Sequence, residues 1–469
     1  MSIHTPTLYE RKVTPMERFL RHSPYSIVTM IARIQGSVTE SMLRSAISKL
    51  RRRHVNLRVR IKEDLDHVPW FTSEEVGEIP IDEVPRESEE HWMKVLGEAC
   101  KVPFEFVDRP AIRFLLVHSP ATSELIILCH HIICDGLSLA YLARDILAAL
   151  GDPSREVEAL PDPVLMDGDT LPSDVSVNGI VKFFIRRINK QWEDSRIFFD
   201  QEDYRNIHDA YWGKYEHRIF SIELSEEQTS LLVERCSRQG VTVNSALTAA
   251  FVGAQSLVQG KKPYHSSVYV AAGVRDRLRK PVGEEMGFYA GMVRLKYDYD
   301  VRRGFWDNAR RFHGKVRPLY TNKNLFADFR TWCHLDPAIL EAVHFKKLGV
   351  LVAPSQSRYR KLSAFGRRED VVASILKRDK QDSLERIFMG TAVTNLTRLD
   401  FPTRYGTLEL DRLIMQPGGG FPLSTVNLVL GALTCAGKFS LVMEYAEQAV
   451  DTETAAKIRD AAMEFLQKD

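Results

Sequence analysis

The chain has 469 residues, of which 44% are hydrophobic and 27% charged, an ordinary globular composition that excludes a disordered or fibrous protein. This length exceeds one ordinary hydrophobic core and predicts two domains or subdomains of about 200 residues each. The 64 basic and 62 acidic residues nearly balance, which argues against a partner nucleic acid bound through bulk charge.

The first half of the chain alternates between strand and helix patterns. Residues 26–34 are β-branched and apolar enough to predict a strand, which ends at Gly36. Ser37 and Glu40 form an S-x-x-E pattern, which predicts a capping box at the start of a helix that runs to about residue 54. Further strands are predicted at residues 57–61, 112–118 and 124–129, and further helices at 89–100 and 138–150.

A change of composition divides the chain. Proline, glycine, aspartate and serine become frequent between residues 151 and 178, which is typical of a linker. We place the linker at residues 166–180, between an N-terminal subdomain at 1–165 and a C-terminal subdomain at 181–469.

The second half begins again with a strand, at residues 219–224, and a capped helix. Ser225 and Gln228 form its capping box and Gly240 ends it. This order hints at two similar α/β units. Later helices are predicted at residues 243–258 and from 451 onward, and strands at 266–272, 292–297, 392–396, 408–415, 423–430 and 439–445.

The cysteines and the N-terminus indicate a cellular compartment. Residues 1–21 lack the apolar stretch of a signal peptide, and no window approaches the roughly 18 uninterrupted apolar residues of a membrane span. The six cysteines show no CxxC spacing, so neither a disulfide framework nor a zinc site is expected. We therefore expect a cytoplasmic protein without a membrane span.

The segment CHHIICDG, residues 129–136, joins an apolar strand directly to a helix. A histidine at the end of a core strand lies at the rim of a cavity, where a neutral imidazole can act as a general base. Asp135 can cap the helix or pair with a buried arginine, and Gly136 permits a tight turn. The pattern predicts proton removal from an amine or hydroxyl that then attacks an activated acyl group. The chain has no G-x-S-x-G elbow, which agrees with direct attack.

The two histidines have two other interpretations, a structural one and a metal site. A single histidine at a strand end is usually a satisfied core residue, but an adjacent pair followed by Asp-Gly at this fixed offset seldom arises by chance. His130 and His131 are neighbours on a strand and point to opposite faces, so they cannot both bind one metal ion without distortion. No metal is therefore expected.

These residues form an HHxxxDG motif, and the chain resembles the superfamily of nonribosomal peptide condensation domains, mycobacterial polyketide-associated acyltransferases and alcohol acyltransferases. The likeness extends to residues 34–61, which contain RRHVNLRVR, and to 395–406 and 422–427. It implies an α/β (α+β) fold of two chloramphenicol-acetyltransferase-like subdomains in a V with a tunnel between them. The DFGWG motif of the plant branch is absent, which disfavours that branch.

The resemblance also implies roles for residues of the motif. His131, the second histidine, corresponds to the catalytic base, with His130 as its companion in the motif. Asp135 corresponds to a structural aspartate that points away from the site into an ion pair, and Gly136 opens the helix and leaves room for substrate. Arg275 lies where the family places the arginine partner of Asp135, with Arg277 as the next candidate and a solvated surface charge as the alternative. Four residues are expected to line the substrate channel, with ordinary packing or a strand edge as the alternative: Ser138, Tyr289, Asn395 and Ser424.

The implied reaction is acyl transfer from a thioester to an amine or hydroxyl of a small-molecule acceptor, which yields an amide or ester in natural-product or lipid biosynthesis. The donor is the phosphopantetheine of an acyl or peptidyl carrier protein, or coenzyme A, and no permanently bound cofactor is expected. A coenzyme-A-dependent O-acyltransferase for lipid esters and a catalytically idle carrier-binding partner are the alternatives. We expect no adjoining adenylation or carrier domain, so that a carrier would act in trans, and we expect a monomer.

Three short basic runs are usually solvated faces, but one of them could receive the phosphates of coenzyme A or the acidic surface of a carrier protein. The runs are Arg51–Arg53; Lys182, Arg186, Arg187 and Lys190; and Arg358, Arg360, Lys361, Arg367 and Arg368.

Overall fold

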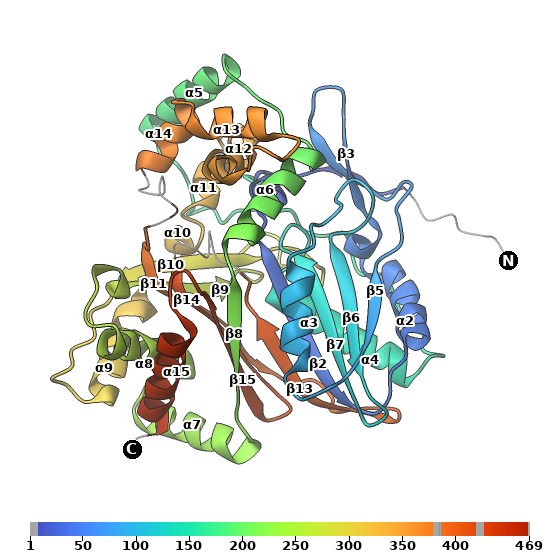
Figure 1. Cartoon of the computed structure of the whole chain (residues 1–469), viewed down its shortest axis with the longest axis vertical. Helices are drawn as coiled ribbons and strands as arrows, with labels where there is room; N and C mark the ends of the chain where they lie inside the picture. Colours follow the sequence, from blue (N-terminus) through green and yellow to red (C-terminus); the bar gives the residue numbers. More distant parts are fainter. Residues whose placement is uncertain (1–7, 379–383, 385, 419–425, 468–469) are drawn as a thin grey trace.

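The computed structural model describes residues 8–378, 384, 386–418 and 426–467, and it contains two six-stranded sheets with helices around them (Figure 1). The first sheet has, in spatial order, β12 (Arg404–Tyr405), β13 (Leu408–Gln416), β2 (Ile27–Gln35), β7 (Thr122–His130), β6 (Ile112–His118) and β5 (Ile81–Pro85). The second has β10 (Ala290–Lys296), β9 (Ser267–Gly273), β11 (Met389–Leu399), β14 (Val426–Cys435), β15 (Lys438–Ala446) and β8 (His217–Glu223). A small sheet joins β1 (Glu10–Lys12), β4 (Pro69–Thr72) and β3 (Arg60–Glu63).

The centre of the first sheet is the antiparallel pair β2 and β7. Both strands are almost wholly buried, as their continuous apolar sequences require, because α2 (Glu40–Arg53) and α4 (Gly136–Gly151) pack together beside β2 while α3 (His91–Cys100) contacts β6, β7 and β8. Figure 1 shows α3 between β8 and the first sheet.

The second sheet is covered by α8 (Val243–Val258), which packs against β11, α9 (Phe305–Val316) and α15 (Thr452–Gln467). The preceding α7 (Glu226–Arg238) contacts β15 and α8. Among the described residues no single helix has the length and apolar composition to cross a membrane; α7 and α8 meet that test only as a pair bent by 92°.

A group of helices lies at one end of the molecule (Figure 1): α5 (Gly179–Glu193), α6 (Gln201–Lys214), α11 (Phe329–Trp332), α12 (Pro337–Leu348), α13 (Tyr359–Arg367) and α14 (Val371–Arg378). The short α10 (Asn322–Leu325) contacts β10 of the second sheet. The buried α12 contacts α1 (Pro15–Arg21), α6, α13 and α14. An ion pair between Arg18 Nη2 and Glu341 Oε2, at 2.8 Å, joins α1 to α12. The N-terminal segment is therefore fixed to residues more than 300 positions later in the chain.

The two sheets are connected through strands that leave their own half of the sequence. β12 and β13 belong to the first sheet, although they lie in the C-terminal half of the chain, and β13 pairs with β2. Glu223 of β8 forms ion pairs with Arg33 of β2, at 2.7 Å, and Arg412 of β13, at 3.1 Å. The division at residues 166–180 stays a prediction, but the sheets do not divide there.

Most predicted elements are present, and two local predictions are wrong. The helix expected after Gly36 is capped by Thr39, whose hydroxyl accepts from the Met42 amide, and not by a box of Ser37 and Glu40. The strand expected at residues 57–61 begins only at Arg60, because residues 55–58 form a 3-10 turn. The capping box of Ser225 and Gln228 is confirmed.

Candidate active site

The HHxxxDG segment is fixed at the junction between β7 and α4. His130 is the last residue of β7 and lies opposite Ile27 of β2, and the amide of His131 donates to the Ser26 carbonyl at 2.8 Å. The helix begins at Gly136. The motif is therefore a short turn whose two ends are held by a buried strand and a buried helix.

His131 is half-buried, and its Nδ1 lies 3.1 Å from the Cys134 carbonyl oxygen. Because a carbonyl only accepts, Nδ1 carries the proton and Nε2 keeps its lone pair. The Phe288 ring stands perpendicular to the imidazole, with the centroids 5.1 Å apart. Burial lowers the pKa of His131 below 6.5, against the opposing effects of the Cys134 and Pro417 carbonyls and the Asp135 charge. The ring is neutral at pH 7 and able to accept a proton.

His130 is fully buried and has both nitrogens occupied. Its Nε2 donates to the Ser23 carbonyl at 3.0 Å, and its Nδ1 accepts from the Ile132 amide at 3.2 Å. The rings of Phe104 and Phe106 pack edge-on against it. Burial lowers the pKa of His130 to about 3, so it stays neutral. It fixes the strand end, whereas the hydrogen bond at Nδ1 of His131 leaves the lone pair of that neutral ring on Nε2.

Asp135 caps α4 and points away from His131 into the protein. Its Oδ1 accepts from the amide and hydroxyl of Ser138, both at 2.7 Å, and from Arg275 Nη2 at 3.0 Å, while its Oδ2 accepts from the Tyr289 amide at 3.1 Å. The expected pairing of Asp135 with Arg275 is present. Charge-assisted hydrogen bonds of this kind are stronger than neutral ones, so the carboxylate is a structural centre.

Arg275 extends this network into the segment between β9 and β10. Its Nη1 donates to the carbonyls of Gly283 and Glu285 at 2.9 and 3.0 Å, and its guanidinium lies 4.6 Å from the centroid of the Tyr289 ring. The next candidate, Arg277, donates instead to Asn322. The second half of the chain thus holds the motif of the first half in place.

Two of the predicted channel residues do not line a channel. Ser138 is fully buried, and its hydroxyl bonds Asp135, Arg275 and the Gly287 backbone. Tyr289 is 2% exposed, and its hydroxyl donates to the Val164 carbonyl at 2.9 Å. Both predictions are wrong because these polar groups satisfy the ion pair and the backbone around it.

The other two channel predictions remain open. Asn395 is half-buried, and its Oδ1 accepts from the Thr397 amide at 2.7 Å at a bulge in β11. Its place in a channel stays a prediction, as does the tunnel itself. Ser424 lies outside the described residues.

The absence of a side chain at Gly136 serves packing. A Cβ there would lie 2.7 Å from Met415 Sδ and 3.3 Å from Leu396 Cδ2, so α4 closes directly onto β13 and β11. The room expected for substrate is therefore occupied by Met415 and Leu396.

Sequence reasoning missed two residues around the motif. The Asn56 amide, 2% exposed, donates to the carbonyls of Ile133 and Met286 at 3.1 and 2.9 Å, so it joins the motif turn to the second half. Phe288 packs against His131. No local pattern could have revealed either contact, because the partners are far apart in the sequence.

In the described part of the chain no cluster of three or more histidine, cysteine, aspartate or glutamate side chains could hold a metal ion. All six cysteines are free thiols. The candidate proton acceptor of the site is Nε2 of the His131 ring, on a turn between β7 and α4.

Comparison with known proteins agrees with the family resemblance of the HHxxxDG motif. Residues 12–159 match the Condensation domain family. A 121-residue segment is 32% identical to part of a nonribosomal peptide synthetase of Aspergillus flavus, over 24% of this chain and 2% of that protein. The matched segments make up 1% to 6% of the length of the curated relatives.

The fold is similar over nearly the whole chain to two solved structures. Trichothecene 15-O-acetyltransferase from Fusarium sporotrichioides has a TM-score of 0.59 at 12% identity, over 98% of this chain and 94% of that one. Polyketide synthase associated protein 5 from Mycobacterium tuberculosis has a TM-score of 0.56 at 15% identity, over 97% and 98%. The mixed α/β fold with two sheets is that of the condensation domains. The HHxxxDG motif thus lies in a segment that matches the Condensation domain family, and the fold of nearly the whole chain is similar to that of solved condensation domains.

Proposed function

We propose that this protein transfers an acyl group from a thioester to the amine or hydroxyl of a small acceptor, with His131 as the general base. The observation that carries the proposal is the hydrogen bond from His131 Nδ1 to the Cys134 carbonyl, which places the lone pair of the half-buried, neutral ring on Nε2. A proton taken by Nε2 frees the acceptor to attack the thioester carbonyl. The new amide or ester bond forms as the carbon–sulfur bond breaks, and the thiol leaves with a proton.

The donor is a phosphopantetheine thioester on a carrier protein or on coenzyme A. One surface favours the carrier. Within the described residues, no ion pair involves the basic run of α5, whereas Arg51, Arg53, Arg358 and Lys361 of the other runs are paired with carboxylates. The side chains of Ile180, Phe183 and Phe184 on α5 are 69%, 61% and 54% exposed. A basic helix with exposed apolar side chains suits the acidic surface of a carrier protein.

We place the reaction in the cytoplasm, which agrees with six free thiols.

The decisive experiment is a thioester-consumption assay on wild type and His131→Ala, with acyl-coenzyme A and acyl-carrier donors and pooled amine and alcohol acceptors. A loss of about 10²-fold or more is expected, the scale for a general base. His67→Ala changes a half-exposed loop histidine and is the matched control, expected to keep wild-type activity.

The two donor arms separate a carrier-dependent enzyme from a coenzyme-A-dependent O-acyltransferase. Equal rates in wild type and His131→Ala would contradict general-base catalysis by His131. A protein that consumes no thioester but binds an acyl carrier tightly would be an idle binding partner.

A further inference from the structure

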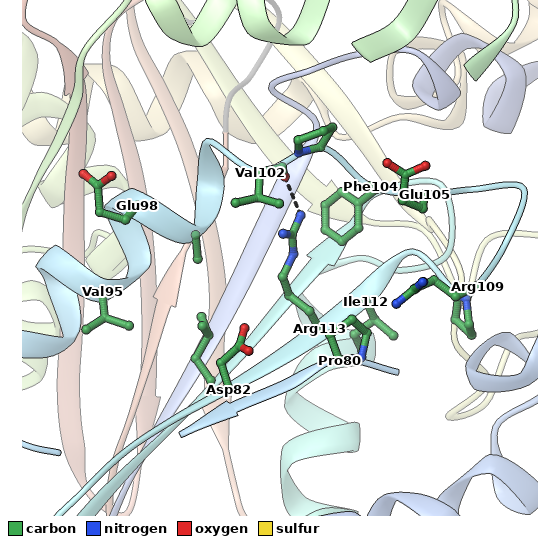
Figure 2. A pocket seen from close by; sticks show the side chains of 14 residues that line it. Pro80, Asp82, Val95, Glu98, Val102, Phe104, Glu105, Arg109, Ile112 and Arg113 are labelled. Carbon is green, nitrogen blue, oxygen red and sulfur yellow. Dashed lines mark hydrogen bonds between the residues drawn. The ribbon is translucent and has the colours of Figure 1, made fainter. Parts of the chain in front are cut away.

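A cavity lies apart from His131, between α3, the strands β5 and β6, and the segment at residues 102–110 (Figure 2). Its volume is about 500 Å³, within the range of small-molecule sites. Mostly apolar side chains line it, among them Val95, Ala99, Phe104, Ile112 and Leu115.

Arg113 of β6 extends into this cavity although it is only 8% exposed. Figure 2 shows its side chain rising between Val102 and Phe104. Nη2 donates to the Val102 carbonyl at 2.5 Å, and the guanidinium lies 4.3 Å from the centroid of the Phe104 ring. A guanidinium has five N–H donors, and in the described part of the chain no carboxylate forms an ion pair with this one. Burial lowers the pKa of Arg113, so its charge is held at a cost.

The other charges around the cavity, with one exception, are already neutralised. Glu98 pairs with Lys101, Glu105 with Arg205, and Arg109 with Asp108. The exception is the exposed Asp82 of β5, for which no ion pair or hydrogen bond is found within the described residues. The cavity therefore offers one buried cation and, at its rim, one carboxylate.

The cavity is separate from the site of proton transfer. Arg113 lies opposite Leu128 of β7, two residues before His130, so Arg113 and His130 share a sheet face. His131 lies beyond the strand end. The connection between the two places is Phe104, which lines the cavity and packs against the His130 ring with centroids 5.7 Å apart. A ligand here would not be the reacting group.

We propose that this cavity binds a small amino-acid-like zwitterion, with its carboxylate on the Arg113 guanidinium and its ammonium group at Asp82. The two oxygens of a carboxylate match the paired N–H groups of a guanidinium, which gives the strongest kind of hydrogen bonding to arginine. The apolar part of the ligand would lie along Val95, Ala99 and Leu115.

Isothermal titration of the full chain with four probes tests the proposal without any assay of acyl transfer, so its outcome is independent of the proposed function. L-leucine carries both charges, 4-methylpentanoate only the carboxylate, 3-methylbutylamine only the ammonium, and inorganic phosphate is a different anion. We expect leucine to bind best, methylpentanoate more weakly, and the amine not at all. Phosphate binding as tight as that of leucine, or no binding of either carboxylate at millimolar concentration, would overturn the proposal.

Variants assign the two charges. Arg113→Met should lower the affinity for leucine and for methylpentanoate by about 10-fold or more, the scale of a charged hydrogen bond. Asp82→Asn changes an exposed side chain, so we expect the fold to be unaffected. The affinity of this variant for leucine should fall to the affinity for methylpentanoate. Arg109→Gln, which removes the other arginine of the lining, is the control and should bind leucine as wild type does. Unchanged leucine binding in both Arg113→Met and Asp82→Asn would refute the assignment.

Discussion

The Arg275 guanidinium lies 3.0 Å from the Asp135 carboxylate, across 140 residues of sequence, and both side chains are 9% exposed. The pair joins the segment after β9 to the first turn of α4. Since Cys134, whose carbonyl orients His131, directly precedes Asp135, the position of the imidazole depends on a residue in the other half of the chain.

Breaking this pair should destabilise the protein strongly. Arg275→Met leaves the Asp135 carboxylate buried without its cation, a change that typically costs about 3–5 kcal/mol of unfolding free energy. Urea denaturation measures it. Arg277→Met removes a less buried arginine on the same segment, which donates to Asn322, and should cost less than about 1 kcal/mol. Adding Asp135→Asn to Arg275→Met should cost less than the sum of the single changes, because the residues interact. Similar effects of the two arginine substitutions would contradict a structural ion pair.

The pH dependence of the reaction follows from the His131 ring. A general base works when it is unprotonated, and burial lowers the pKa of His131 below 6.5. The value of kcat/KM should therefore be constant above about pH 7 and fall as the pH drops through the lowered pKa. Steady-state rates between about pH 5 and about pH 8 would show this limb. A rate that rises steadily from about pH 7 to about pH 8 would mean that another group limits the reaction.

Gly136 should not accept a methyl group. In Gly136→Ala the new Cβ would lie 2.7 Å from Met415 Sδ, and overpacking of this kind costs about 1–3 kcal/mol. Thermal unfolding and the thioester assay should both show the loss, because the strained helix start adjoins the motif turn. Gly179→Ala is the matched control, since Gly179 also opens a helix but has nothing within 4 Å of the position that a methyl group would take. Equal melting temperatures for the two variants would show that Met415 moves aside.

The sequence predicted the parts of this site that are encoded locally. The apolar run of β7, the two histidines and the helix after Asp135 lie within a few residues of one another, so their order alone placed the imidazole at a strand end. The placement of Arg275 came from the resemblance to a family and not from its own surroundings. Ser138 and Tyr289 were misassigned because their burial depends on Arg275 filling the space beside them.

Three other features of the structure could not be predicted from the sequence patterns. β13 joins β2 through about 380 residues of intervening chain, and no periodicity in either strand identifies the partner. The sequence of α5 predicts a basic run, but it does not show that the apolar side chains Phe183 and Phe184 remain exposed. The N-cap of α2 is Thr39, two residues after the predicted Ser37, because the backbone path after Gly36 determines where the helix begins.

A buried carboxyl group in β15 should make stability depend on pH. Burial raises the pKa of Glu444 from 4.5 to about 7, against a hydrogen bond from Gln416. The folded state therefore keeps a proton that the unfolded chain releases between these values, so this group lowers stability as the pH rises from 4.5 to about 7.

Glu444→Gln removes that dependence. The difference in unfolding free energy between this variant and wild type should grow in favour of the variant by up to about 3 kcal/mol as the pH rises from about 4 to about 8. One pKa unit corresponds to about 1.4 kcal/mol. Urea denaturation at both pH values gives the difference. Glu216→Gln, at a side chain that is 55% exposed, is the control and should show little change relative to wild type. A pH-independent difference between Glu444→Gln and wild type would contradict the shifted pKa.

The basic helix α5 offers a test of the donor that rests on the proposed function. Arg186→Glu/Arg187→Glu reverses two exposed charges of α5. It should weaken the binding of an acidic carrier protein, mainly by slowing its association. The rate with acyl-carrier donors at low concentration should fall by about 10-fold, with a smaller loss at high salt because screening weakens the attraction. The rate with an acyl-pantetheine thioester, which has no carrier surface, should stay at the wild-type value. Arg302→Glu/Arg303→Glu reverses two adjacent arginines elsewhere, at side chains 88% and 55% exposed, and should leave both rates unchanged. If Arg186→Glu/Arg187→Glu used the carrier donor as fast as wild type at every salt concentration, the carrier would dock on another face, and α5 would be left as a solvated surface.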